Sequence, residues 1–168
     1  MKIIGKYPKT RLRRVRNNDW IRRLVSENDL STNDLILPLF IREGKNKVES
    51  IKNMPGVYRY SLDKINKIID QSIKLKIPMI ALFPYIPKNK KNKLGTEALN
   101  QSNLICRALK LIKKNKKNIG VMCDVALDPF TSHGHDGIIK DNEVNNDKTI
   151  EVLVKQSLLY AKMGCDVL

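Results

Sequence analysis

The sequence has 168 residues, with 32 Lys and Arg against 17 Asp and Glu, and a net charge of +15. This length corresponds to one domain, and a hydrophobic content of 42% is enough for a folded core, which excludes a wholly disordered chain. No apolar run reaches the roughly 18–20 residues of a membrane helix, and the first residues lack the apolar stretch of a secretory signal.

The positive charge is concentrated in two segments. Residues 1–23 carry nine basic side chains and one acidic side chain, and residues 88–117 carry ten and one. The second segment has no aromatic residue that could stack on bases, and nine of its ten basic residues are lysines. Such lysine enrichment is typical of an A+T-rich genome. The charge therefore favours solvated surface over binding to nucleic acid or an anionic membrane, and the salt dependence of retention on a nucleic-acid column separates these alternatives.

Three cysteines, Cys106, Cys123 and Cys165, are widely spaced. They form no CxxC or Cys/His finger pattern, which argues against a disulfide framework and against a structural zinc site. Reduced thiols within apolar stretches are typical of a cytoplasmic protein, and we expect that location.

The N-terminal segment is basic and irregular over residues 1–17, which predicts an extended arm. Trp20 and Leu24 then stand at a helical spacing, so a short amphipathic helix is predicted over residues 19–27. We expect an arm over residues 1–30 that packs on another surface, followed by a domain over residues 31–168.

Beyond the arm, apolar runs alternate with amphipathic segments. Four apolar runs predict strands that are buried on both faces: residues 35–41, 77–83, 119–126 and 165–168. Three amphipathic segments predict helices: residues 62–75, 102–115 and 149–163. Ser61 is the expected N-cap of the first helix. The alternation predicts an α/β fold with a parallel sheet.

The order of elements alone does not separate an open, doubly wound sheet from a closed (β/α)8 barrel. No GxGxxG or GxxxxGK[ST] pattern follows a predicted strand, which removes the main support for a dinucleotide site or a P-loop. A complete (β/α)8 barrel takes about 250 residues, so this chain accommodates only part of one. Because the sequence stops inside an apparent strand, we expect that sequence is missing.

The densest group of reactive side chains is CDVALDPFTSHGHDG at residues 123–137, directly after the third predicted strand. In parallel α/β folds, functional sites are built at this end of the sheet. Asp124 interrupts an apolar run, where an unpaired carboxylate is costly. It therefore either caps a neighbouring backbone group or points into a site.

The same segment offers possible metal ligands. Asp128 and Asp136 are able to converge on a hard cation through carboxylate oxygens, and the alternative is a polar, glycine-containing surface loop. His133 and His135 alternate and lack the i,i+4 spacing of zinc ligands on a helix. A structural role is favoured for both histidines.

Residues 124–137, DVALDPFTSHGHDG, resemble the metal loop of the delta-aminolevulinic acid dehydratase family, also called porphobilinogen synthases. Four further blocks resemble the same family: RLRRVRNNDWIRRLVSEN at 11–28, DLILPLFIREG at 34–44, SIKNMPGVYRYSLD at 50–63 and IPMIALFPYIP at 77–87. The blocks occur in order, so the resemblance covers nearly the whole chain.

The resemblance implies a (β/α)8 barrel preceded by an arm that embraces a neighbouring subunit, usually in a homo-octamer. This chain then corresponds to the arm, the first three βα units and the start of the fourth strand. The implied reaction is that of a hydro-lyase of tetrapyrrole and heme biosynthesis, which condenses two molecules of 5-aminolevulinate to porphobilinogen.

The resemblance also implies roles for single residues. Asp124 matches the family's active-site aspartate. Zinc-dependent members carry three cysteines at the positions of Ala126, Asp128 and Asp136, and this chain has none of them. It therefore resembles the aspartate-rich branch that responds to magnesium, and Mg2+ at Asp128 and Asp136 is expected in place of Zn2+.

The family's two Schiff-base lysines match positions after Leu168. None of the lysines present lies in an apolar predicted strand, where loss of hydration would favour the reactive neutral amine. We therefore expect a polypeptide of these 168 residues alone to be inactive. The alternative is a non-catalytic half-barrel that complements a separately encoded second half.

Overall fold

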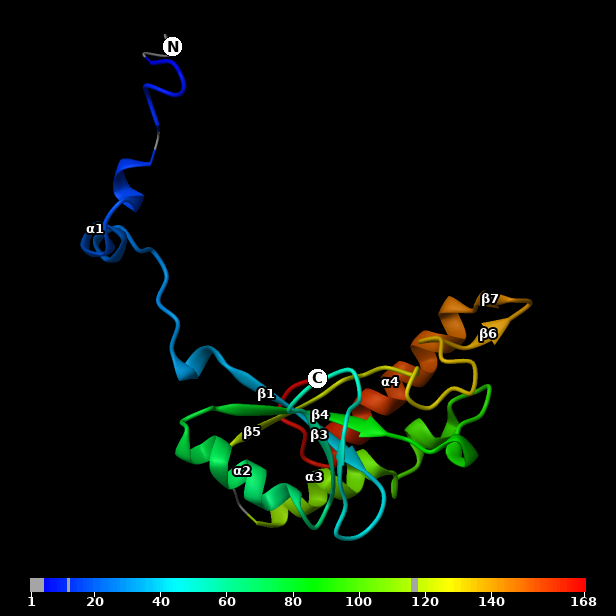
Figure 1. Ribbon diagram of the computed structural model, residues 1–168. Helices are drawn as coiled ribbons and strands as arrows, with labels where there is room; N and C mark the ends of the chain where they lie inside the picture. Colours follow the sequence, from blue (N-terminus) through cyan, green and yellow to red (C-terminus); the bar gives the residue numbers. More distant parts are fainter. Residues whose placement is uncertain (1–4, 12, 116–117) are drawn as a thin grey trace. The chain divides into compact units, whose positions relative to one another are not determined.

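The computed structural model describes residues 5–11, 13–115 and 118–168. The chain divides into a small N-terminal unit that ends at Ser31 and a larger unit over Thr32–Leu168 (Figure 1). The small unit contains a 3-10 turn, η1 (Arg14–Arg16), and one short helix, α1 (Asp19–Leu24). Thus the predicted amphipathic helix forms over six residues. The apolar side chains of this helix are solvent-exposed, since Trp20 is 58% exposed and Leu24 is 76% exposed.

A five-stranded, mostly parallel sheet forms the centre of the larger unit. Its strands are β1 (Ile36–Arg42), β2 (Val48–Ser50), β3 (Tyr58–Ser61), β4 (Met79–Tyr85) and β5 (Gly120–Cys123). The spatial order is β2-β3-β1-β4-β5, in which only β2 runs antiparallel to its neighbour. The predicted α/β fold with a parallel sheet is confirmed.

Three helices connect and cover the strands: α2 (Ile65–Lys74), α3 (Leu104–Lys114) and α4 (Asn146–Lys162). The shorter elements are three 3-10 turns, η2 (Thr32–Asp34), η3 (Lys88–Lys90) and η4 (Thr96–Leu99), and a hairpin of β6 (Ile139–Lys140) and β7 (Glu143–Val144). Two asparagines cap the longer helices, because Asn103 accepts from the Cys106 N–H and Asn145 from the Lys148 N–H. None of the described helices is long and apolar enough to cross a bilayer.

The expectation that Ser61 caps a helix is wrong. Ser61 is the last residue of β3 and is fully buried, and its hydroxyl bonds to the backbone of Lys47 at the turn before β2. The residue before α2 is Lys64. Ser61 therefore stabilises the pairing of β2 with β3 instead of the start of a helix. The sequence pattern did not predict these two strands.

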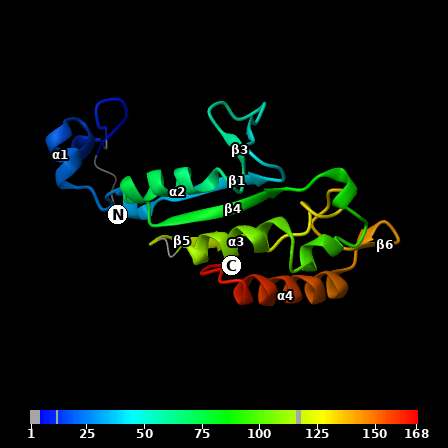
Figure 2. The same cartoon turned by 90° about the horizontal axis from the view of Figure 1, so that it is seen from below.

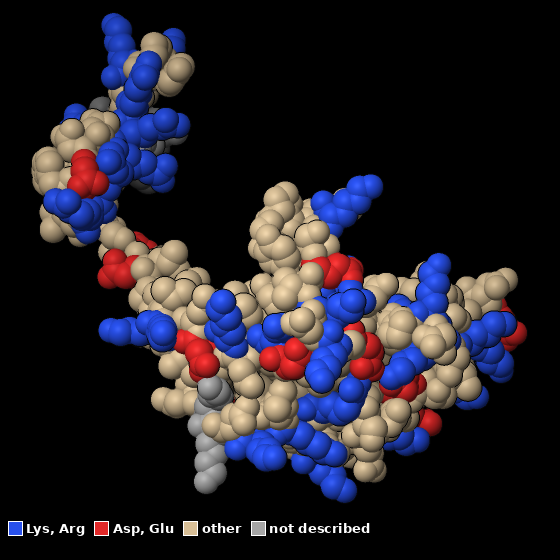
Figure 3. Space-filling view, turned by 60° about the horizontal axis from the view of Figure 1, so that its bottom comes forward, with Lys and Arg blue, Asp and Glu red and all other residues tan. Residues whose placement is uncertain are grey.

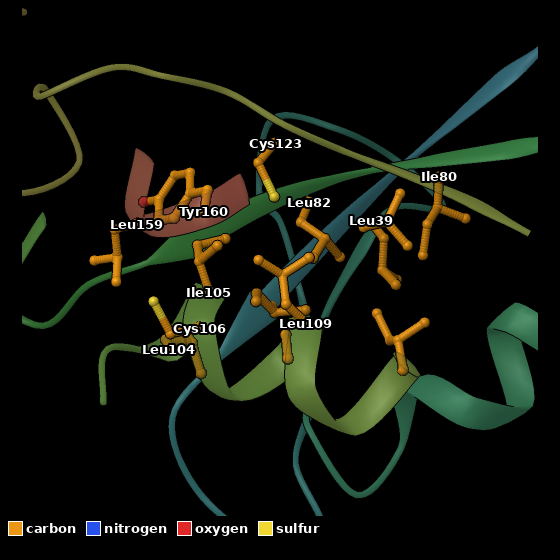
Figure 4. Packing of buried hydrophobic residues seen from close by; sticks show 14 of the residues in the cluster. Leu39, Ile80, Leu82, Leu104, Ile105, Cys106, Leu109, Cys123, Leu159 and Tyr160 are labelled. Atoms are coloured by element: carbon orange, nitrogen blue, oxygen red, sulfur yellow. The ribbon is translucent and has the colours of Figure 1, made fainter. Parts of the chain in front are cut away.

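The hydrophobic core lies between one face of the sheet and the helices (Figures 2 and 4). Alternate strand residues are buried there, for example Leu39 on β1, Leu82 on β4 and Val121 on β5. They pack with fully buried side chains of the helices, which include Leu109 on α3 and Tyr160 on α4. This burial fixes which strand residues point away from the helices.

The opposite face of the sheet carries the other alternate residues. Phe40 and Phe83 are register partners of β1 and β4, and their rings lie 5.5 Å apart. Both are half-buried. At the end of the chain, Val167 forms a parallel bridge with Met122 of β5, and its carbonyl accepts from the Cys123 N–H. The predicted fourth strand is thus present as a single bridge beside β5.

Candidate functional site

Two loops meet at the carboxyl ends of β4 and β5. Asn92, in the loop after β4, bridges to Thr131, in the loop after β5. The Asn92 N–H donates to the Phe130 carbonyl at 3.3 Å, and the Ser132 N–H donates to the Asn92 carbonyl at 3.0 Å. We call these segments the lysine loop, residues 86–95, and the acidic loop, residues 124–137. The backbone bonds make the two loops one surface at the edge where parallel α/β folds build their sites.

Asp124 opens the acidic loop immediately after Cys123, the last residue of β5. Cys123 is buried toward the helices, and its register partner is Leu82. The alternation of the strand therefore directs Asp124 to the other face, which Phe83 shares. Asp124 is exposed and accepts no hydrogen bond from the part of the chain that is described. This supports a site residue over a backbone cap.

Asp128 and Asp136 are both exposed in the acidic loop. Partial burial and the negative charges of Asp136 and Asp124 raise the pKa of Asp128. The three carboxylates therefore act on one another electrostatically. One oxygen of Asp136, Oδ1, accepts from the Leu127 N–H at 2.5 Å. Within residues 5–11, 13–115 and 118–168, no group of three His, Cys, Asp or Glu side chains is arranged to hold a metal ion.

Both ring nitrogens of His133 contact the backbone. Its Nε2 lies 3.2 Å from the Lys93 carbonyl, and its Nδ1 accepts from the His135 N–H at 3.2 Å. Because a carbonyl only accepts, Nε2 carries the proton and Nδ1 does not. Both ring nitrogens are engaged, which fits the structural role expected for His133. His135 lies beside it, with the ring centres 5.6 Å apart.

The two glycines of the acidic loop have different roles. Gly134 has a φ of +76°, a left-handed conformation that glycine adopts without strain, and a side chain there would meet open space. Gly137 is needed for space, because an added Cβ would lie 2.6 Å from Cγ1 of Val144. The first glycine shapes the loop, and the second allows it to pack on β7.

Two side chains that sequence reasoning missed hold the acidic loop. Gln156 of α4 is fully buried, and its Nε2 donates to the Ala126 carbonyl at 3.1 Å and to the Tyr160 hydroxyl at 3.0 Å. Lys91 places its Nζ 3.5 Å from the Asp128 carbonyl. A glutamine among the apolar positions of the last helix was a possible signal for the first contact. Nothing local indicated the second, which spans 37 residues.

An ion-pair cluster anchors the start of the lysine loop to the end of β1. Glu43 accepts from Lys90 at 2.8 Å and from Arg107 at 2.5 Å. Burial alone raises the pKa of Glu43, but the bonds from Arg107 and Lys90 outweigh it, and the net pKa is lowered. The cluster fixes the direction in which the lysine loop leaves the sheet.

Comparison with known proteins finds matches to one protein family. The family model described as "Delta-aminolevulinic acid dehydratase" matches residues 9–168. A curated protein of that name from Bradyrhizobium diazoefficiens is 52% identical over 158 residues, covering 94% of this chain and 45% of the relative. One from Chlamydia pneumoniae is 39% identical over 157 residues, covering 94% and 47%.

A solved structure has the same arrangement of elements. It is the delta-aminolevulinic acid dehydratase of Toxoplasma gondii in complex with the reaction product porphobilinogen, with a TM-score of 0.86 and 34% sequence identity. The match covers 94% of this chain and 46% of that chain. The chain thus spans about half the length of the relatives that it matches.

Proposed function

The chain belongs to the delta-aminolevulinic acid dehydratase family, and from this premise we propose that it contributes to the condensation of two 5-aminolevulinate molecules into porphobilinogen. The observation that carries the proposal is the family match over residues 9–168, which includes the acidic loop at the carboxyl end of β5. The porphobilinogen named for the Toxoplasma structure supports this choice of product.

We propose that the sheet is a section of a (β/α)8 barrel. The parallel strands β1, β4 and β5 lie side by side in the sheet in the order in which the chain forms them, and helices connect them on one face, as in that fold. The TM-score of 0.86 over 94% of the chain supports this assignment. The face of Phe40 and Phe83 would then be the inner face of the barrel.

We propose that Asp124 is a catalytic residue. An exposed carboxylate at the carboxyl end of a barrel strand is placed to meet a substrate bound above the sheet. When ionised, it pairs with the substrate ammonium group or accepts a proton from it. Phe83, on the same face, offers an apolar contact beside that charge.

We propose Asp128 and Asp136 as ligands for Mg2+. The donor set fits, because both side chains offer carboxylate oxygens. Burial and, after it, repulsion by Asp136 raise the pKa of Asp128, and a divalent cation would relieve that repulsion. Mg2+ is commonly held by one or two carboxylates and by water, so a third protein ligand is not needed. When bound, the ion would stabilise negative charge on substrate oxygens. Ala126 offers no donor for zinc.

We propose that a polypeptide of these 168 residues alone has no dehydratase activity. No lysine stands on any of the five strands of the described sheet, so none has the apolar strand setting expected for an imine-forming amine. If the chain alone is inactive, the second candidate function is that of a half-barrel module, which pairs with a chain that carries the rest of the fold. The half-buried Phe40 and Phe83, on the sheet face away from the helices, are apolar side chains suited to such association.

One experiment tests these proposals together. The purified chain is incubated with 5-aminolevulinate and Mg2+, and porphobilinogen is detected with an aldehyde reagent. No colour is expected from the chain alone, and colour is expected when the carboxyl-terminal half of a relative is added. Borohydride reduction should trap substrate only on the added half. Colour from the chain alone would refute its proposed inactivity, and no colour from the mixture would count against complementation.

We propose that the protein is cytoplasmic and that the arm joins copies of it, as in a family octamer. The exposed Trp20 and Leu24 on α1 are apolar side chains suited to contact another subunit. Sedimentation analysis should show larger assemblies for the whole chain than for a chain without residues 1–30. Equal assemblies would contradict a role for the arm.

A further inference from the structure

We propose that a pocket between the lysine loop and the acidic loop binds a phosphate group, either free or on a small-molecule ester. The pocket has a volume of about 460 Å3 and is lined by Lys88, Lys91, Thr131, Ser132, His133 and Gly134. This inference goes beyond the proposed dehydratase function and does not depend on it. It also gives a role to part of the basic segment at residues 88–117.

The pocket lining is rich in donors. Lys88 is exposed, and Lys91 is only weakly engaged, with its Nζ 3.5 Å from the Asp128 carbonyl. Ser132 is an exposed hydroxyl. The backbone N–H groups of His133 and Gly134 donate to no acceptor in the described residues. Gly134 has a left-handed conformation, which is one of the two backbone conformations that make up the concave, anion-binding nests of successive N–H groups.

No carboxylate is among the described residues that line the pocket, since neither Asp128 nor Asp136 lines it. Lys91 does interact electrostatically with the nearby Asp128. The Thr131 hydroxyl is already committed as a donor to the His135 carbonyl at 2.9 Å. The imidazole of His133 is also engaged at both nitrogens, as described above. The donors left for a ligand are the ammonium groups of Lys88 and Lys91, the Ser132 hydroxyl, and the backbone N–H groups of His133 and Gly134.

The lysines of the lysine loop have two different roles: one forms a structural ion pair, and others line the pocket. Lys90 is bound to Glu43 at 2.8 Å and is not among the residues that line the pocket. Its neighbours Lys88 and Lys91 line the pocket. The lysines of this segment are therefore not uniformly solvated, although Figure 3 shows Lys and Arg spread widely over the visible surface.

A phosphate group matches this donor set better than a carboxylate does. It carries up to two charges and three or more acceptor oxygens, which can engage both lysines and the backbone donors at once. A single carboxylate has two oxygens and one charge. The lining has no aromatic ring besides the engaged His133 on which a base could stack, so a nucleic acid is not the favoured occupant.

The test is an NMR titration of the 168-residue chain with inorganic phosphate at constant ionic strength. The amide signals of His133 and Gly134 should shift saturably. The double variant Lys88→Gln/Lys91→Gln should weaken binding by at least about tenfold, the size expected when charge-assisted hydrogen bonds are lost. The matched control is Lys67→Gln/Lys74→Gln, which removes two exposed lysines of α2 and should leave the affinity unchanged.

Several outcomes would overturn the proposal. One is the absence of saturable shifts at His133 and Gly134, and another is an equal loss of affinity in both double variants. Shifts of the same amides by 5-aminolevulinate but not by phosphate would make the pocket a carboxylate site. Tighter binding of longer oligonucleotides, equally sensitive to the α2 lysines, would make it a nucleic-acid surface. A phosphate monoester probe distinguishes a free from an esterified phosphate.

Discussion

The carboxylate of Asp136 accepts a 2.5 Å hydrogen bond from the backbone N–H of Leu127, nine residues earlier in the chain. One residue of the proposed metal pair therefore also closes the acidic loop. Asp136→Asn keeps an acceptor for the Leu127 N–H but removes the charge, whereas Asp136→Ala removes both. These two substitutions separate a structural role from a ligand role.

For Asp136→Asn we expect near-normal stability and at least about tenfold weaker binding of Mg2+ or the probe ion Mn2+, measured by water-proton relaxation. For Asp136→Ala we expect an additional loss of about 1–3 kcal/mol in unfolding free energy, because a buried N–H loses its partner. The control is Asp141→Asn, at a hairpin position with φ of 53° that asparagine also adopts. Unchanged Mn2+ binding in Asp136→Asn would exclude Asp136 as a ligand.

Asp124 is the residue on which the proposed chemistry depends. In an active assembly, reconstituted with the carboxyl-terminal half of a relative, Asp124→Asn should lower kcat by about 10²–10⁴-fold, as expected for loss of a general base. Because Asp124 is exposed, the melting temperature should hardly change. Full activity of Asp124→Asn would refute the assignment, and Asp141→Asn serves again as the control.

Glu43 makes the stability of the fold depend on pH. Its pKa is lowered below the ordinary value of 4.5, since Arg107 and Lys90 outweigh the effect of burial. A lowered carboxyl pKa stabilises the folded state above pH 4.5, and this contribution is lost as the pH falls through the lowered value. Glu43→Gln should therefore cost about 1 kcal/mol at pH 7, and the difference from the native chain should shrink in acid. Urea unfolding at several pH values measures this, and a constant difference would contradict it.

Cys165 is the thiol expected to react first. A hydrogen bond from the Cys123 thiol lowers the pKa of Cys165, whereas burial raises the pKa of Cys106 to about 11. Alkylation by iodoacetamide should label Cys165 before the other two cysteines, with a rate that rises with pH below the ordinary pKa of 9.0. In Cys123→Ala the pH dependence of this rate should move upward, toward that ordinary value. Mass mapping of the labelled peptides checks the order, and first labelling at Cys106 would contradict the prediction.

Leu109 tests the core between the sheet and α3. Its side chain is fully buried, so Leu109→Ala should lower the unfolding free energy by about 2–5 kcal/mol. Leu158→Ala removes the same atoms from a leucine on α4 that is 66% exposed. This substitution should change the unfolding free energy by less than about 0.5 kcal/mol. Equal effects would mean that Leu109 is not part of the core described.

The sequence pattern predicted the long elements because apolar periodicity reflects burial directly. The runs at 35–41 and 77–83 lie on β1 and β4 because both strands pack against helices. The pattern missed β2 and β3, which are short and whose apolar side chains are exposed or only partly buried. It placed the start of α4 at residue 149, but the helix begins three residues earlier, at Asn146, after the capping Asn145.

The candidate site was predictable only in part. A cluster of acids after an apolar strand indicated Asp124, Asp128 and Asp136, and all three lie in one loop at the carboxyl end of β5. The contacts that shape this loop come from distant residues: Gln156 reaches the Ala126 carbonyl from α4, and Lys91 reaches the Asp128 carbonyl from the loop after β4. Such pairings depend on the packing of the whole sheet, which local spacing does not encode.

The bridge between Asn92 and Thr131 has a thermodynamic consequence. It joins a segment that offers cationic donors to one that offers carboxylates, so anything that orders one segment also lowers the entropic cost of ordering the other. Linkage requires that an anion held on one side and a cation held on the other change each other's affinity by the same factor. Through the backbone bonds of Asn92 to the acidic loop, the proposed anion site and the proposed cation site would act as one cooperative binding element.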